Sequence, residues 1–137
     1  MLAAEQDYRP SESEPFMNDR QKEYFRQKLL RWKDEILRES RETIENLQKE
    51  NENHPDFADR ASNETDRSIE LRARDRQRKL IAKIDAALRR IDEGEYGWCE
   101  VSGEPIGINR LIARPIATMT VEAQQAHERR EKVSRDD

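Results

Sequence analysis

Helix-breaking residues are nearly absent from a long central stretch of the chain. All four glycines lie within residues 94–107, and within residues 16–93 the one glycine or proline is Pro55. Glycine and proline interrupt helices through backbone entropy, a missing donor and a fixed φ. The distribution therefore predicts two long helices, at about 18–50 and 61–93, joined by one turn.

Apolar residues recur along both predicted helices at alternating intervals of three and four, which is typical of paired helices. The first helix carries two such runs, Phe25, Leu29, Trp32 and Ile36, then Leu37, Ser40, Ile44 and Leu47. The second carries Ile69, Ala73, Arg76, Leu80, Ile84, Ala87 and Ile91. We expect these stripes to meet in an antiparallel hairpin. A structural coiled-coil scaffold with no other function is one interpretation of such a rod.

Composition excludes several classes of protein. Charged residues make up 41% of the 137 and apolar residues 34%, which leaves too little apolar material for a large core. A net charge of −4 argues against direct, sequence-specific DNA binding. The absence of a signal peptide or a long apolar stretch predicts a soluble, cytoplasmic protein without membrane contact. We find no nucleophile–base pair and no glycine-rich phosphate loop, so we do not expect an enzyme.

The segment between the helices combines carboxylates with an aromatic residue. It contains Asp56 and Asp59 together with His54 and Phe57. Either carboxylate could cap the second helix, and capping is the simplest interpretation of Asp59. Alternatively, carboxylates at the end of a long hairpin could approach a metal ion or a basic group inside a partner. Spacing alone leaves both interpretations open.

The region after residue 93 has the spacing of a zinc-finger frame but not its ligands. Two residues separate Cys99 from Ser102, and after seventeen further residues Thr120 and Ala123 repeat that gap. Hydroxyls are poor zinc ligands and alanine is none. We therefore expect a degenerate zinc finger that holds no metal and is stabilised by apolar packing. Cys99 cannot form an internal disulfide, and we expect it to be a small buried apolar residue.

Ordered motifs run along nearly the whole chain: FMN at 16–18, PDFADRAS at 55–62, SIELRARDRQRKLIAKI at 68–84, GEYGWCE at 94–100 and GEPIGINRLIARPIA at 103–117. Together these motifs resemble the DksA/TraR family of RNA polymerase-binding transcription factors. The resemblance implies a mainly α fold, a monomer in which a long antiparallel coiled-coil hairpin is attached to a small globular module. Its expected parts are an N-terminal segment (1–17), the hairpin (18–93, tip at 51–61), and the zinc-finger region with a C-terminal helix (94–137).

The resemblance also implies a function. Family members insert the hairpin into the secondary channel of RNA polymerase and alter open-complex stability. They repress ribosomal RNA promoters and activate amino-acid biosynthesis promoters, together with guanosine tetraphosphate in the stringent response. A Gre-like transcript-cleavage accessory factor, with tip carboxylates holding Mg²⁺, is the alternative function.

Family residues carry over position by position. Asp56, Asp59 and Ala61 match the tip motif, and Arg76 and Lys83 match basic residues that bind polymerase. Lys83 and Arg114 match residues that contact the nucleotide. At Gln124 the family usually has a lysine that contacts the nucleotide, so this chain departs from the pattern there.

Overall fold

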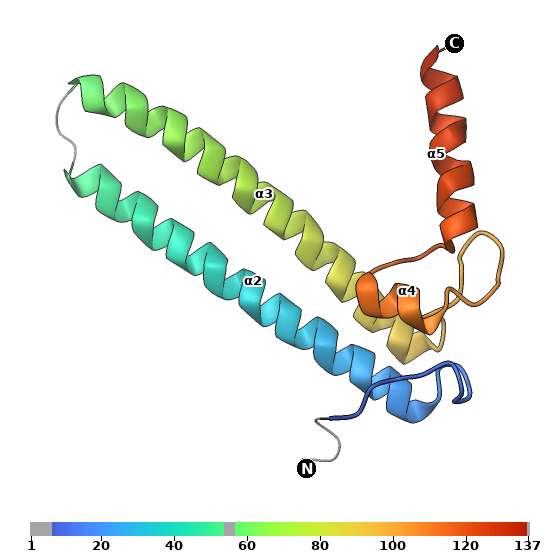
Figure 1. The fold of residues 1–137 in the computed structure, drawn as a ribbon. Coiled ribbons are helices and arrows are strands. Elements are labelled where there is room, and N and C mark those ends of the chain that lie inside the picture. Colours follow the sequence, from blue (N-terminus) through green and yellow to red (C-terminus); the bar gives the residue numbers. More distant parts are fainter. Residues whose placement is uncertain (1–6, 54–56, 137) are drawn as a thin grey trace. The chain divides into compact units, whose positions relative to one another are not determined.

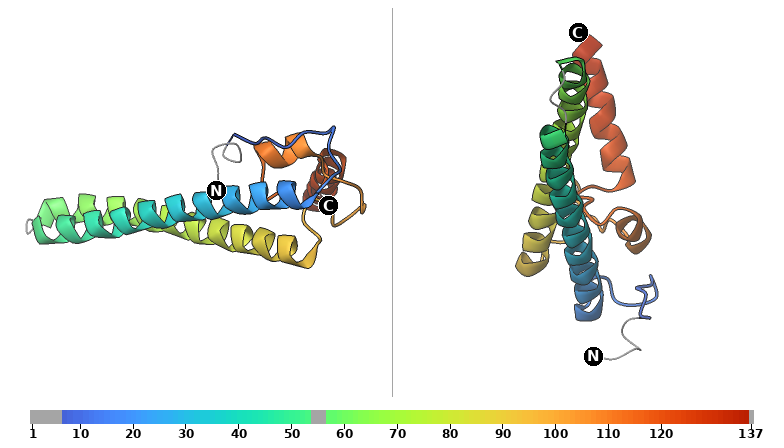
Figure 2. Two further views of the ribbon diagram at one scale, coloured as in Figure 1. Left: turned by 90° about the horizontal axis from the view of Figure 1, so that it is seen from below. Right: turned by 90° about the vertical axis from the view of Figure 1, so that its left-hand side faces the viewer.

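The computed structural model describes residues 7–53 and 57–136, with side chains at all of these except 47, 50–53, 57–63, 135 and 136. Its elements are α2 (Asp19–Asn53), α3 (Phe57–Glu93), α4 (Ile108–Ala113) and α5 (Val121–Asp136). Figure 1 shows α2 and α3 running antiparallel, and the two views of Figure 2 show the same pairing. The prediction of a mainly α fold with a long helical hairpin is confirmed.

Both long helices extend further toward the turn than the sequence predicted. α2 continues to Asn53 and α3 already begins at Phe57, instead of ending near 50 and starting near 61. Proline is tolerated just before or at the first residues of a helix, and alanine and arginine in the segment FADRA favour helix. Within the described residues, no helix is both long and apolar enough to span a membrane.

The start of α2 and the end of α3 carry residues that are typical of helix termini. Asn18 Oδ1 accepts a hydrogen bond of 2.8 Å from the Gln21 amide, which makes Asn18 the N-cap of α2. Gly94 follows α3 with φ +79°, and its amide donates to the Ile91 carbonyl at 3.2 Å. Glycine adopts this left-handed conformation without a Cβ clash, so it ends the helix at low cost.

The chain divides into two compact units, Leu30–Asp85 and the combination of Met1–Leu29 with Ala86–Asp137. The first unit contains most of α2 and α3. The second contains the start of α2, the end of α3, α4 and α5. We refer to the second as the globular unit.

The core of the globular unit is built around aromatic and aliphatic side chains from distant parts of the sequence. Phe25, Leu29, Ile108 and Leu111 are at most 2% exposed. The ring of Tyr96 lies 5.5 Å from that of Phe25, and its hydroxyl donates to the Pro115 carbonyl at 2.7 Å. The short helix α4 is thereby held against the outer ends of α2 and α3.

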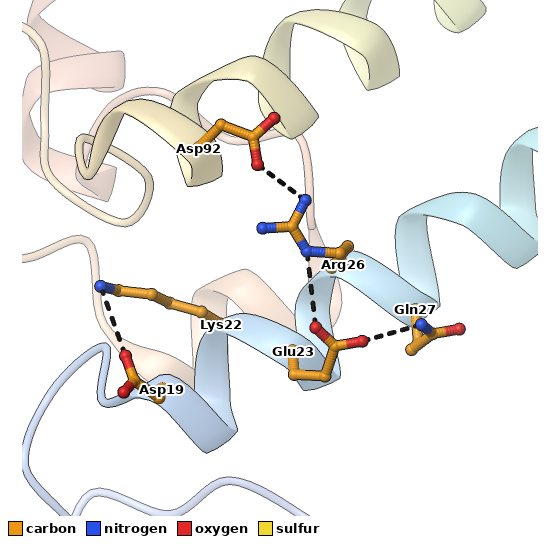
Figure 3. Close-up of polar contacts among 6 residues, drawn as sticks. All are labelled: Asp19, Lys22, Glu23, Arg26, Gln27 and Asp92. Atoms are coloured by element: carbon orange, nitrogen blue, oxygen red, sulfur yellow. Dashed lines mark hydrogen bonds and ion pairs between the residues drawn. The ribbon is translucent and has the colours of Figure 1, made fainter.

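A surface ion pair also joins the two long helices in the globular unit. Arg26 Nη1 lies 2.8 Å from Asp92 Oδ1, while its Nε lies 3.5 Å from Glu23 on the preceding turn of α2 (Figure 3). Glu23 in turn accepts a hydrogen bond from Gln27 Nε2 at 2.8 Å. Because these side chains are substantially exposed, the contacts fix side-chain geometry more than they stabilise the fold.

The predicted apolar stripes are only partly correct on both long helices. On α2, Phe25, Leu29 and Ile36 are buried, as expected, but Leu37, the first residue of the second predicted run, is 41% exposed. On α3, however, Ile69 is 56% exposed and Arg76 is also exposed, so neither lies in the seam. The more enclosed positions there include Glu70 and Gln77, which polarity-based patterning assigns to the solvent face.

Candidate functional site

The carboxylate motif expected at the tip falls on the junction of the two long helices. Asp56 lies outside the described residues, and Asp59 and Ala61 lie in the first turns of α3. Because α3 begins at Phe57, Asp59 is its third residue rather than its N-cap, so the capping interpretation of Asp59 is wrong. A carboxylate at that position still interacts favourably with the positive end of the helix dipole.

The two basic residues expected to bind polymerase lie on the exposed surface of α3. Arg76 and Lys83 are both exposed and seven residues apart, which is close to two helical turns. They therefore project from the same side of the helix. Their guanidinium and ammonium groups are available to carboxylates or phosphates of a partner.

Arg76 also borders an open groove of about 730 Å³ along α3. Leu71, which is 50% exposed, contributes an apolar surface, and Arg72 lies beside it. Glu64 and Asp75 place negative charge on the same groove. The groove thus combines an apolar side chain with charges of both signs, an arrangement suited to contacts with another protein.

The residues expected to contact a nucleotide lie in different compact units. Lys83 belongs to Leu30–Asp85, whereas Arg114 belongs to the globular unit. Arg114 is exposed and ends α4, where its amide donates to the Arg110 carbonyl at 2.7 Å. Gln124 lies on α5 and donates from Nε2 to Glu128 at 3.1 Å. Each side chain is placed by its own helix.

The four positions of the zinc-finger frame form two similar turns. The Ser102 amide lies 3.4 Å from the Cys99 sulfur, and the Ala123 amide donates to Thr120 Oγ1 at 3.1 Å. A hydrogen bond from the Glu100 amide to the Thr118 carbonyl, at 2.9 Å, joins the segments that carry these turns. Cys99 and Thr120 are 3% and 7% exposed. The frame is therefore compact, with its first and third positions buried.

The environment of Cys99 was only partly predictable. It is buried, as expected, and burial raises the pKa of its thiol. The Ser102 hydroxyl and backbone amides of Ser102, Thr120 and Val101 more than offset this effect and lower the pKa to about 6. The sequence carries no signal for this lowered pKa, because the donors that cause it, the Ser102 hydroxyl and the backbone amides, are aimed at the sulfur by the fold.

Comparison with protein families identifies matches along most of the chain. Residues 21–91 match the family model described as DnaK suppressor protein DksA, N-terminal domain. Residues 94–129 match that of the prokaryotic dksA/traR C4-type zinc finger. The two matches meet near the end of α3, at Glu93.

Individual relatives and a solved structure give the same result. The chain is 72% identical over 137 residues to the RNA polymerase-binding transcription factor DksA of Caulobacter vibrioides, covering 100% of this chain and 96% of the relative. It is 40% identical over 131 residues to the protein of that name from Escherichia coli K12, covering 96% and 87%. The structure of transcription factor DksA2 from Pseudomonas aeruginosa matches with a TM-score of 0.81 and 41% identity, covering 90% of this chain and 93% of that one.

The expectation that no zinc belongs to this region is contradicted by these comparisons. The matched family model is that of a C4-type zinc finger, which points to zinc binding. The fit of this chain to the metal is partial, since Cys99 supplies a thiol, Ser102 and Thr120 supply hydroxyls, and Ala123 supplies no donor. Among the described residues, no three His, Cys, Asp or Glu side chains gather as a metal site.

Proposed function

Because the chain belongs to the DksA/TraR family, we propose that it is a transcription factor that binds RNA polymerase directly. The observation that carries this proposal is the 72% identity, over the whole chain, with a relative named for that activity. The factor would act in the cytoplasm as a monomer, and it would contribute no catalytic chemistry of its own. It would reach promoters through polymerase, without sequence-specific contacts to DNA.

In this proposal the hairpin of α2 and α3 enters the secondary channel of polymerase. In the unit Leu30–Asp85, the helices run for about 35–45 Å at 1.5 Å per residue, in a bundle only two helices thick. A rod of this length and width can reach into a narrow channel. Asp56, Asp59 and Ala61 would then approach the polymerase active site and change the stability of the open complex.

The exposed basic face of α3 would contact the channel. Arg76 and Lys83 project from one side of the helix, and charge-assisted contacts with polymerase carboxylates are stronger than neutral hydrogen bonds. Next to Arg76, the half-exposed Leu71 offers an apolar contact within the groove. Basic groups around an apolar side chain would fix both the orientation and the depth of insertion.

Guanosine tetraphosphate would be the effector, bound where this protein meets polymerase. Lys83 and Arg114 are the residues that would meet its phosphates. A neutral amide at Gln124, in place of a lysine, removes one cation from this set. The nucleotide response would therefore be weaker than in relatives that have lysine there.

Transcription in vitro from a ribosomal RNA promoter and an amino-acid biosynthesis promoter tests the proposal. Purified factor should shorten the open-complex lifetime and lower ribosomal transcription, and should raise transcription from the biosynthetic promoter. Guanosine tetraphosphate should enhance both effects. The same factor added to a halted elongation complex should produce no shortened transcripts. Transcript cleavage would favour the Gre-like alternative, and failure to retain core polymerase would favour a structural scaffold.

A further inference from the structure

The two ends of the hairpin within the unit Leu30–Asp85 differ in helix-forming residues. Residues 30–37 and 78–85, here called the proximal half, contain no Ser, Thr or Asn. The distal half comprises residues 38–53 and 57–77, and contains nine: Ser40, Thr43, Asn46, Asn51, Asn53, Ser62, Asn63, Thr65 and Ser68. These side chains compete with the helix by bonding to nearby backbone in other conformations. The distal helices are therefore intrinsically weaker.

Packing within this unit shows the same division. Ile36 and Ile84 are its buried residues among those described, and both lie in the proximal half. The same half contains the ion pair between Lys33 and Asp85, at 2.8 Å. No described side chain of the distal half is buried. Among the distal side chains that the structure describes, little apolar area is therefore buried to hold the helices together.

The distal seam also contains polar atoms that lack partners. Glu70 Oε2 and Gln77 Oε1 are sealed from solvent and accept no hydrogen bond. They are seven residues apart, so they lie on one face of α3. Because a buried acceptor without a donor loses its hydration without compensation, the closed seam carries a penalty that separation of the helices would relieve.

We propose that the distal half of the hairpin opens locally while the proximal half stays paired. Weak helix formers, sparse apolar burial and two unpartnered acceptors all lower the free energy of opening in the same segment. The tip would then be joined to the stable proximal half by a segment whose helices can separate locally. If the proposed function is correct, this local opening lets the tip adjust its position inside the polymerase channel.

Hydrogen exchange of the free, full-length protein tests this directly. We expect amides in residues 64–77 to exchange about 100-fold or more faster than those in residues 80–85, relative to their intrinsic rates. Equal protection of the two segments would overturn the proposal. No polymerase is involved, so this result is independent of the proposed function.

A variant with an apolar seam tests the cause. Replacing Glu70→Leu and Gln77→Leu together should slow exchange across residues 64–77 by about tenfold or more, because both unpartnered acceptors are removed. The matched control, Glu64→Leu with Arg78→Leu, adds two leucines at exposed positions. It should leave the difference in exchange rate between residues 64–77 and 80–85 nearly unchanged. The proposal fails if the seam variant exchanges like the wild type or like the control.

Discussion

Lys33 of α2 and Asp85 of α3 form an ion pair, with 2.8 Å between Nζ and Oδ1. Both side chains are about a third exposed, so solvent screens the attraction. We predict a coupling energy of about 0.2–1 kcal/mol in a double-mutant cycle of Lys33→Ala and Asp85→Ala, measured by urea unfolding. Salt at molar concentration should lower this coupling energy, because it screens the two charges. A coupling well above this range would show that the pair is effectively desolvated.

Thr120 acts as the N-cap of α5, since its Oγ1 accepts from the Ala123 amide at 3.1 Å. Thr120→Ala should therefore destabilise the protein by about 1 kcal/mol, because this donor loses its partner. Thr120→Ser keeps the hydroxyl and should cost much less. Thermal unfolding of both variants, at fixed zinc concentration, checks the prediction. Equal losses would assign the effect to the methyl group instead.

Tyr96 should make the fold sensitive to alkaline pH. Burial raises the pKa of its hydroxyl far above the usual 10, and the nearby charge of Arg90 only partly offsets this. The raised pKa stabilises the fold fully below about pH 10, and this contribution is lost as pH rises through the higher folded value. Tyr96→Phe should flatten the alkaline loss of stability measured by urea unfolding between pH 8 and 11. The pKa of Tyr8 is also raised, to about 12, so part of the alkaline loss of stability should remain in the Tyr96→Phe variant.

The same substitution has a cost at neutral pH. Phenylalanine leaves the Pro115 carbonyl without the donor that now lies 2.7 Å away. A buried acceptor that loses its partner costs about 1–3 kcal/mol. Tyr96→Phe should therefore be less stable than wild type at pH 7, and the gap should narrow as pH rises. A constant gap would contradict the assignment of the alkaline sensitivity to this hydroxyl.

The hairpin was predictable because breakers and apolar repeats act locally along the sequence. Phe25, Leu29, Ile36 and Ile84 were assigned to the seam correctly. The assignment of Ile69 and Arg76 to the seam was wrong, because apolar spacing identifies the residues between two helices only where those residues are apolar. In this part of α3 the more enclosed positions are the polar residues Glu70 and Gln77, which an apolar pattern cannot identify.

The region after α3 was less predictable. Its apolar residues indicated packing, yet Trp98 and Val101 are 39% and 61% exposed, while Ile106 and Ile108 are buried. Which apolar side chains enter the core depends on the long-range contacts of α4, and these have no periodic signature. Likewise, the lowered pKa of Cys99 arises from the Ser102 hydroxyl and from backbone amides, and only the fold determines whether these donors point at the sulfur.

Gln124 offers a test of the nucleotide response. If a lysine here contacts guanosine tetraphosphate in the family, Gln124→Lys should lower the nucleotide concentration for half-maximal inhibition of a ribosomal promoter, through an added charge-assisted contact. The fold should tolerate the change, because the present contact with Glu128 is exposed. Gln125→Lys adds the same charge at the neighbouring exposed position and serves as the control. An equal effect of both variants would point to net charge alone.

Asp59 separates an effector role from a structural one. As the third residue of α3 it stabilises the helix through the dipole, so Asp59→Asn should cost about 0.3–1 kcal/mol and leave helicity nearly unchanged. If the carboxylate acts inside the polymerase channel, the variant should bind polymerase normally yet lose its effect on open-complex lifetime at saturating factor. Asp66→Asn removes an exposed carboxylate further along α3, outside the groove, and should stay active. An Asp59→Asn protein that shortens open-complex lifetime like the wild type would show that the charge is not the effector.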